Sequence, residues 1–217
     1  MNANQTTSDI VIVHVDPDFV IVDKPSGLLS VPGRGPEKAD CVWRRVQAQF
    51  PEALTVHRLD METSGLMVFA RSIDAQRHLG KAFENRQVEK KYEAIVAPMI
   101  TGDEGEISFP LICDWPNRPR QIVDHEIGKP SLTRYRVLAR DAASGYAGCT
   151  RVRLFPLTGR SHQLRVHMQA IGHPILGDSL YANESTPPSS RLLLHAAKLA
   201  FPMPNGANAT FQSAVPF

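Results

Sequence analysis

A chain of 217 residues with 42% hydrophobic and 21% charged side chains is long enough for a sizeable core and has the composition of an ordinary globular protein. The net charge of +2 excludes a general polycation, and no apolar stretch reaches the roughly 20 residues that would cross a bilayer. The three cysteines, Cys41, Cys113 and Cys149, are too widely spaced for a disulfide framework or a paired-cysteine zinc site. We therefore expect a cytoplasmic protein that is not attached to a membrane.

The polar residues 1–9 lack the basic start and apolar run of a signal peptide, so we expect a flexible N-terminal tail. No repeat and no long low-complexity linker divides residues 10–217, which we expect to form a single domain. Within it, the β-branched runs Ile10 to Val15 and Phe19 to Val22 flank an Asp-Pro-Asp turn and predict a hairpin.

A first helix is predicted to begin at an Asp40 cap, to bury Val42, Val46 and Phe50, and to end at Pro51. Its apolar residues recur at helical spacing. The proline cannot continue the helix.

Further elements alternate irregularly along the middle of the chain. Residues 66–70 predict a buried strand, residues 73–87 a helix, and residues 88–97 a strand in which Lys90 and Tyr92 share one face. Because strands outnumber helices and do not follow a regular βαβ order, we predict an α+β fold. Its mixed, mainly antiparallel sheet would be flanked by helices and loops.

The second half of the chain contains a long stretch that is basic and free of acids. From residue 151 to residue 177 there are four arginines and three histidines but no Asp or Glu. Arg151 and Arg153 share a face of a predicted strand, and residues 161–171 predict a helix that Gly172 ends. Clustered base in a nearly neutral chain indicates a local anionic partner, although a solvated sheet face is an equal alternative.

Asp60 is the first candidate for chemistry. It stands in His57-Arg58-Leu59-Asp60-Met61-Glu62-Thr63-Ser64-Gly65-Leu66, between a basic pair and a Thr-Ser-Gly turn. A carboxylate is costly to bury unless a cation meets it. In an extended segment Arg58 and Asp60 would project from the same face. A lone Asp before a turn, however, more often only caps the turn or pairs with a neighbour such as Arg58.

Two basic segments could meet such a carboxylate. Gly159 permits a tight turn before the helix predicted over residues 161–171. Either Arg160 or Arg165 could reach an acid from a neighbouring element, although solvated arginines are the commoner outcome. In the strand Lys90-Lys91-Tyr92, the aromatic side chain could stack on a base while the amines meet phosphates, or it could simply pack in the core.

Several other chemistries are disfavoured. The chain has no phosphate-binding loop or dinucleotide fingerprint, and Ser64 lacks the context of a nucleophile elbow. His162 and His167 are five residues apart and would not share a helix face for a metal. We therefore expect a site without metal or cofactor, built from a carboxylate, arginines and an aromatic ring.

A set of blocks in chain order resembles the motifs of the RluA-type pseudouridine synthases. They are Lys24 to Gly27, His57 to Leu66, Lys91-Tyr92, Gly159 to His167 and Arg191 to Ala196. One such block would be weak support, whereas the ordered set is specific to the family. Longer relatives carry a small N-terminal RNA-binding domain, which we expect to be absent because the first strand starts near Ile10.

The resemblance implies a sheet with a central RNA-binding cleft, in which uracil is detached from its ribose, rotated and rejoined through carbon without a cofactor. It implies that Asp60 is catalytic, that Arg165 pairs with it and that Tyr92 stacks on the uracil. Arg58 would occupy the space that the flipped base leaves. The remaining substrate-binding residues that we expect are His57, Leu164, Arg160, Lys91, Arg118 and Arg120.

Residues 110–121 resemble the dual-specificity members of that family. The implied partners are a large-subunit (23S) rRNA loop and a tRNA anticodon stem-loop, and a monomer would suffice. Extruding a base costs a few kcal/mol, least in a poorly stacked loop, and stacking on an aromatic ring returns roughly 1–3 kcal/mol. A loop uridine is therefore the natural substrate.

Two other functions remain open at this point. A binding module that has lost catalysis would tolerate Asp60→Asn. A carboxylate-dependent hydrolase of nucleosides or glycosidic bonds would need a second acid, for which Glu62 is the nearby candidate.

Overall fold

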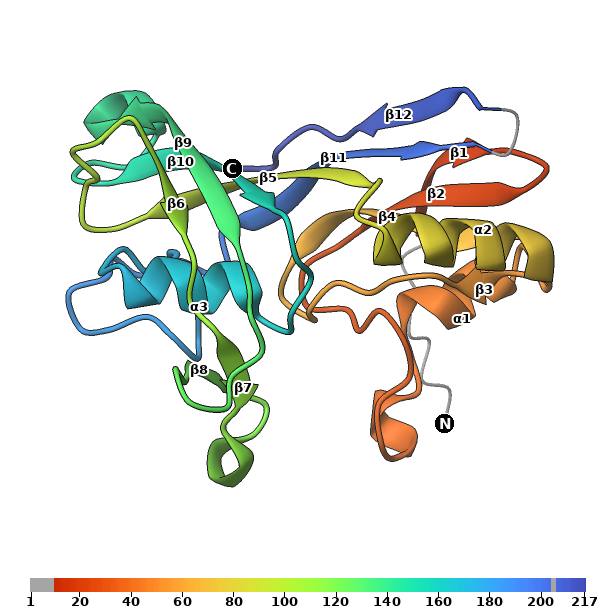
Figure 1. Cartoon of the computed structure of the whole chain (residues 1–217), viewed down its shortest axis with the longest axis horizontal. Helices are drawn as coiled ribbons and strands as arrows, with labels where there is room; N and C mark the ends of the chain where they lie inside the picture. The colour runs from red at the N-terminus through yellow and green to blue at the C-terminus, as the bar shows by residue number, and fades with distance from the viewer. Residues whose placement is uncertain (1–9, 204–205) are drawn as a thin grey trace, which may run out of the picture.

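The structure, a computed structural model, describes residues 10–203 and 206–217 (Figure 1). The predicted flexible tail, residues 1–9, lies outside the described residues. The strands are β1 (Val11–Val15), β2 (Phe19–Lys24), β3 (Leu54–Thr55), β4 (Ser64–Ala70), β5 (Glu89–Val96), β6 (Glu104–Ile107), β7 (Leu111–Cys113), β8 (Gln121–Val123), β9 (Thr133–Arg140), β10 (Thr150–Pro156), β11 (Leu194–Pro202) and β12 (Asn208–Gln212). The helices are α1 (Val42–Gln47), α2 (Ile73–Glu84) and α3 (Gln163–Ala170), with 3₁₀ turns η1 (Pro36–Lys38), η2 (Trp115–Asn117) and η3 (Asp141–Ser144).

Ten strands form one sheet in the order β1-β2-β4-β11-β5-β10-β9-β6, with β12 added to β11 and β3 added to β4. Among the described strands, every pair is antiparallel except β4 with β11. The hairpin β7–β8 is a separate small sheet. The predicted α+β class with a mixed, mainly antiparallel sheet is confirmed.

Strand β4 is the centre of the core, and all seven of its residues are buried. Alternation along the strand sends Leu66 and Val68 into a cluster with α2, while Met67 and Phe69 pack against α1 on the other face. A strand covered on both faces is apolar without interruption, which explains why this segment carries a continuous hydrophobic run.

The sheet opens between β5 and β10. Their pairing ends at Leu154 opposite Tyr92, although β10 continues beside β9 to Pro156 and β5 begins earlier, at Glu89, beside β11. The two strands therefore diverge beyond Tyr92. Figure 1 shows the resulting halves, with α1 and α2 on one side and α3 and the β7–β8 hairpin on the other.

The start of α1 differs from the prediction. Its N-cap is Cys41, which makes no side-chain cap hydrogen bond, and the Asp40 carboxylate pairs with the Arg45 guanidinium at 2.6 Å. Asp40 thus contacts the helix through an ion pair with the Arg45 side chain and does not cap it. The prediction that Asp40 is the N-cap is wrong.

Three further helix boundaries differ from the prediction. Helix α1 ends at Gln47 and does not extend to Pro51, and backbone dihedrals explain the other two. Helix α2 ends at Glu84 instead of Gln87 because Arg86 has a φ of 59°, outside the helical region. Helix α3 begins at Gln163, later than predicted, because His162 adopts a left-handed conformation with a φ of 52°. Among the described residues no helix is both long and apolar enough to span a membrane.

Candidate active site

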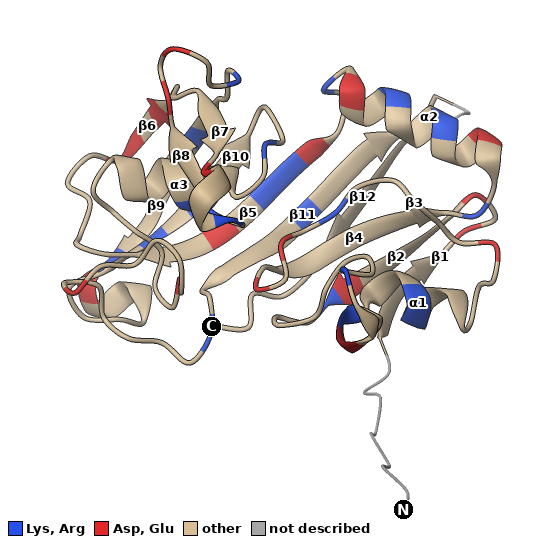
Figure 2. Cartoon of the chain, turned by 90° about the horizontal axis from the view of Figure 1, so that it is seen from below, with Lys and Arg blue, Asp and Glu red and all other residues tan. Residues whose placement is uncertain are grey.

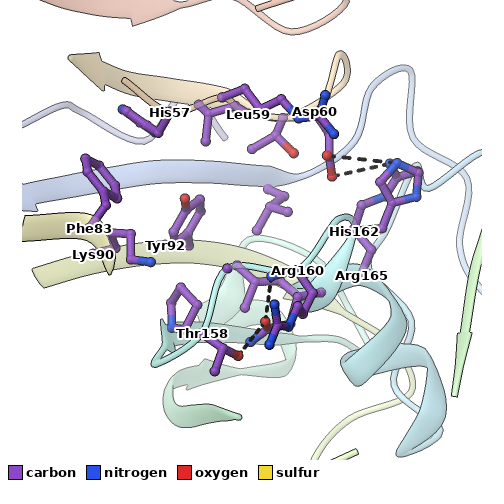
Figure 3. A pocket seen from close by; sticks show the side chains of 17 residues that line it. His57, Leu59, Asp60, Phe83, Lys90, Tyr92, Thr158, Arg160, His162 and Arg165 are labelled. Atoms are coloured by element: carbon purple, nitrogen blue, oxygen red, sulfur yellow. Dashed lines mark hydrogen bonds and ion pairs between the residues drawn. The ribbon is translucent and has the colours of Figure 1, made fainter. Parts of the chain in front are cut away.

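A cavity of about 290 Å³ lies where β5 and β10 diverge, and Figure 3 shows its lining side chains. We call it the central cavity. Seven of the ten site residues predicted from the sequence line it: His57, Arg58, Asp60, Tyr92, Arg160, Leu164 and Arg165. The tertiary structure thus brings together segments that lie about a hundred residues apart.

Asp60 belongs to an irregular segment between β3 and β4, not to an extended strand. The segment is fixed by Leu59, which is 8% exposed. The Ser30 hydroxyl accepts a hydrogen bond from the Leu59 N–H at 3.0 Å and donates one to the Leu59 carbonyl at 2.7 Å. The neighbouring Asp60 side chain, 27% exposed, is left at the cavity wall.

Lys24 supports the same segment from beneath. It is fully buried, and its ammonium donates to two carbonyls of its own turn at 2.6 and 2.8 Å and to the Met61 carbonyl at 2.7 Å. The Ser26 hydroxyl donates to the Glu62 carbonyl at 2.7 Å. Burial lowers the pKa of Lys24 to about 7. The Lys24-Pro25-Ser26-Gly27 block is therefore a platform for the loop that carries Asp60.

Two nitrogen-bearing side chains face the Asp60 carboxylate (Figure 3). The Arg165 Nη1 atom lies 3.8 Å from Asp60 Oδ2, and His162 Nε2 lies 3.9 Å from Oδ1. Both residues come from the start of α3. The predicted proximity of Arg165 and Asp60 is present, but the contact is loose.

The tight partner of Arg165 is Asp178. The guanidinium, 3% exposed, donates from Nε and Nη2 to the two Asp178 oxygens at 2.8 and 2.7 Å. Burial by itself lowers the pKa of Arg165, but Asp178 and then Asp60 more than compensate and raise it. Sequence reasoning missed Asp178. The available signal was that it is the first acid after the basic stretch.

Tyr92 projects from β5 into the middle of the cavity (Figure 3). It packs against the buried cluster that contains Leu164. Burial, reinforced by the charge of Asp60, raises the pKa of Tyr92. The phenol therefore keeps its proton at neutral pH and can donate a hydrogen bond there, but it cannot serve as a base.

The end of the cavity opposite Asp60 is formed by His57 and Phe83, whose rings stack with centroids 4.7 Å apart. His57 Nε2 accepts a hydrogen bond from the Val68 N–H at 3.1 Å. Burial, with a smaller contribution from Lys90, lowers the pKa of His57 to about 3, so the ring is neutral. Lys90 faces the same end and makes no ion pair in the described part of the chain. Figure 2 shows the lysines of β5 as a basic band with an acidic residue at each end.

Three predicted contact residues lie outside the central cavity. Lys91 is on the opposite face of β5 from Tyr92, and its ammonium lies 3.0 Å from a Glu89 oxygen. Arg118 lines a second cavity of about 630 Å³, which shares Asp60 with the first. The Arg120 guanidinium carbon lies 5.6 Å from the centroid of the Tyr181 ring. Lys90 thus takes the position that the sequence analysis gave to Lys91.

The strand arginines face away from the cavity. Arg153 lies 2.7 Å from a Glu93 carboxylate oxygen and Arg151 3.7 Å from the other. Both stand on the face of β10 opposite Val152 and Leu154. Because Glu93 already pairs with both arginines, Arg151 and Arg153 do not fit the anionic partner expected for the basic stretch.

Comparison with known proteins identifies the class. The sequence profile of the family described as RNA pseudouridylate synthase matches residues 18–170. The chain therefore belongs to the RNA pseudouridylate synthase family, and the expected resemblance is confirmed. The enzyme is an RNA-modifying isomerase.

Individual relatives agree with this assignment. The chain is 55% identical to the dual-specificity RNA pseudouridine synthase RluA of Vibrio vulnificus, over 88% of this chain and 76% of that protein. It is 53% identical to the protein of the same name from Yersinia pestis, over 90% of this chain and 93% of that protein. The solved structure of human RNA pseudouridylate synthase domain containing 1 superposes with a TM-score of 0.81 at 29% identity, covering 96% of this chain and 84% of that one.

Proposed function

We propose that the central cavity converts an extruded uridine of an RNA loop into pseudouridine, with Asp60 as the catalytic carboxylate. One observation carries this assignment. The Asp60 carboxylate faces the cavity, two nitrogen groups stand within 4 Å of it, and none of them forms a close ion pair with it. The Asp60 oxygens therefore stay accessible to a ligand while two nitrogen groups face them.

The isomerisation breaks the bond between ribose C1′ and uracil N1 and forms one between C1′ and C5. N1 gains a proton and C5 loses one, so no atom is added overall. Asp60 contributes either by attack at the sugar, by attack on the base ring, or as a base on a glycal route. In each case Arg165 offsets the negative charge of the free carboxylate.

Tyr92 is proposed to stack on the extruded uracil, with Leu164 as the other wall of the cavity. Stacking of this kind is worth roughly 1–3 kcal/mol, comparable with the cost of extruding a poorly stacked base. Its raised pKa keeps the Tyr92 phenol protonated, so it can assist proton transfer as a hydrogen-bond donor.

The rim residues are proposed to hold the RNA around the extruded nucleotide. Arg58 is exposed at the cavity mouth and would fill the gap left in the base stack. Arg160 and Lys90 line the cavity and make no ion pair within the described ranges, and the one side-chain hydrogen bond of Arg160 there is from Nε to the Pro130 carbonyl at 3.3 Å. Both cations can therefore meet phosphates. His57, held neutral, offers a ring nitrogen to the base or the backbone.

The RNA targets are proposed to be a large-subunit (23S) rRNA loop and a tRNA anticodon stem-loop. Support comes from the dual specificity named for the similar proteins and from the turn that joins β7 and β8. There Trp115 is 65% exposed, and the Arg118 guanidinium stands 4.7 Å from its centroid, a pair suited to unstacked loop bases. We further propose a single-domain monomer that acts in the cytoplasm, in keeping with its unpaired cysteines.

A hydrolase of glycosidic bonds would need a second acid beside Asp60. Glu62 lines the second cavity and not the central one, and the bend at residues 61 and 62 removes the strand alternation that would have aligned it with Asp60. This geometry does not favour hydrolysis.

Tritium release from uridine-C5-labelled transcripts tests the proposal. Wild type should release tritium from both the rRNA and the tRNA transcript without freeing uracil, and Asp60→Asn should release none while still binding. Asp74→Asn is the matched control, since Asp74 is 93% exposed on α2. Release by Asp60→Asn at the wild-type rate would show that Asp60 is not catalytic. Release from only one of the two transcripts by wild type would contradict dual specificity.

A further inference from the structure

Tyr181 lies directly behind the groups that face Asp60. It is 5% exposed, and its ring centroid is 5.2 Å from the Arg165 guanidinium carbon. Its hydroxyl oxygen is 2.8 Å from His162 Nδ1 and 2.8 Å from the backbone nitrogen of Gln121. One phenol thus contacts α3 and the first residue of β8 at the same time.

Counting the protons assigns the direction of these hydrogen bonds. The Gln121 N–H can only donate, so the Tyr181 oxygen accepts from it. The single Tyr181 O–H then has His162 Nδ1 as its hydrogen-bond partner among the described residues. If Nδ1 accepts, the proton of a neutral imidazole is on Nε2. Burial lowers the pKa of His162 despite the opposing charge of Asp60, which favours that neutral ring.

We propose that Tyr181 is a positioning residue that holds His162 in the Nε2–H tautomer, with that N–H presented to the Asp60 carboxylate. Nε2 lies 3.9 Å from Asp60 Oδ1, so a shift of about 1 Å makes a hydrogen bond. The inference rests on the proposed role of Asp60 and adds a function for two residues behind it.

The same phenol ties this arrangement to the turn proposed to contact the RNA. Its bond from Gln121 fixes β8 at the end of the turn that carries Trp115 and Arg118. Asp178 anchors the other side, since its Oδ1 accepts from the Tyr181 N–H at 3.1 Å and from Arg165 at 2.7 Å. Tyr181 is thereby held at two points, through its hydroxyl by Gln121 and through its backbone N–H by Asp178.

Tyr181→Phe removes only the hydroxyl. We expect kcat to fall by about tenfold, within the range that small misplacements of catalytic groups produce. KM and the Kd for RNA should change by less than about twofold, because Gln121 stays paired with Cys113 in the β7–β8 hairpin. Tyr135→Phe is the matched control, because the Tyr135 hydroxyl has no hydrogen bond within the part of the chain that the structure describes. An unchanged kcat in Tyr181→Phe, or a rise in KM alone, would overturn the proposal.

Two further measurements separate positioning from simple support of the fold. Two-bond ¹H–¹⁵N spectra should show His162 as the Nε2–H tautomer in wild type and as a mixture in Tyr181→Phe, and the same tautomer in both would overturn the proposal. In His162→Gln an amide can present an N–H at the place of Nε2 without help from Tyr181. Adding Tyr181→Phe to it should then cost less than about twofold, whereas a further tenfold loss would indicate support of the fold.

Failure of this inference can be told apart from failure of the proposed function. If wild type releases no tritium, the role of the cavity is wrong. If wild type is active and Tyr181→Phe is equally active, only the positioning role is wrong.

Discussion

The arginines on the two sides of the β5–β10 strand pair have different partners. Arg165 of α3 lies on the cavity side, and Arg153 of β10 lies on the far side. On the cavity side, Arg165 is buried in a two-point pair with Asp178 and only loosely faces Asp60. On the far side, the partly exposed Arg153 contacts Glu93 directly at 2.7 Å. On the cavity side the Asp60 carboxylate stays open to a ligand, whereas on the far side Glu93 and Arg153 neutralise each other.

This difference shows that a stretch of sequence free of acids is not free of acids in space. Glu93 comes from the neighbouring strand, and Asp178 follows the stretch directly. Arg58, Lys90 and Arg160 line the central cavity and make no ion pair in the described residues, whereas Arg151 and Arg153 on the far face both pair with Glu93. We therefore expect RNA to contact the cavity face.

The largest expected effect is on kcat, and it distinguishes Asp60 on the cavity side from Glu93 on the far side. Asp60→Asn should lower kcat by at least about a thousandfold, since it removes the group that acts on the reacting nucleotide. Glu93→Gln should leave kcat within about twofold. Single-turnover tritium release measures both, and a comparable loss in the two variants would contradict the division between the faces.

The second effect concerns stability. Asp178→Ala leaves the Arg165 guanidinium buried without its partner, so the free energy of unfolding should fall by about 3–5 kcal/mol. Glu93→Ala should cost about 1–2 kcal/mol, because Arg151 and Arg153 are partly exposed and can be hydrated. Urea unfolding monitored by circular dichroism measures this difference, and equal losses would show that the two pairs are equivalent.

The third effect is a pH dependence that originates in the cavity. The His57 pKa is lowered to about 3, whereas the unfolded chain binds a proton near pH 6.5. Between these values the unfolded state holds the extra proton, so stability falls as the pH falls. From pH 7 to pH 4.5, wild type should lose about 2–3 kcal/mol more unfolding free energy than His57→Gln. Parallel pH profiles for the two proteins would show that His57 is not held neutral.

The smallest effect tests which cations meet phosphate. Arg160→Gln should make the dependence of log K for RNA on log salt shallower by about one unit, and Arg118→Gln should do the same. Arg153→Gln, on the far face, should leave the slope unchanged and serves as the matched control. A shallower slope for Arg153→Gln would indicate that RNA contacts the opposite face of the sheet.

Much of the fold could be predicted because local patterns already encode it. The buried run at β4, the hairpin of β1 and β2, and the shared face of Lys90 and Tyr92 follow from periodicity alone. Helix ends were less accurate, since left-handed backbone at Arg86 and His162 has no signature in residue type. The loop that carries Asp60 was misjudged as extended because its shape depends on distant contacts with Lys24 and Ser30.

The sequence by itself determined the family, the fold class and the acid at the centre of the site, because the motifs that carry Asp60, Tyr92 and Arg165 are local strings. Only the tertiary structure decided which partner each charge meets. The strand pairing places Glu93 opposite Arg153, and chain folding brings Asp178 and Tyr181 behind α3. Electrostatic partners depend on distance in space, and spacing along the chain does not set that distance.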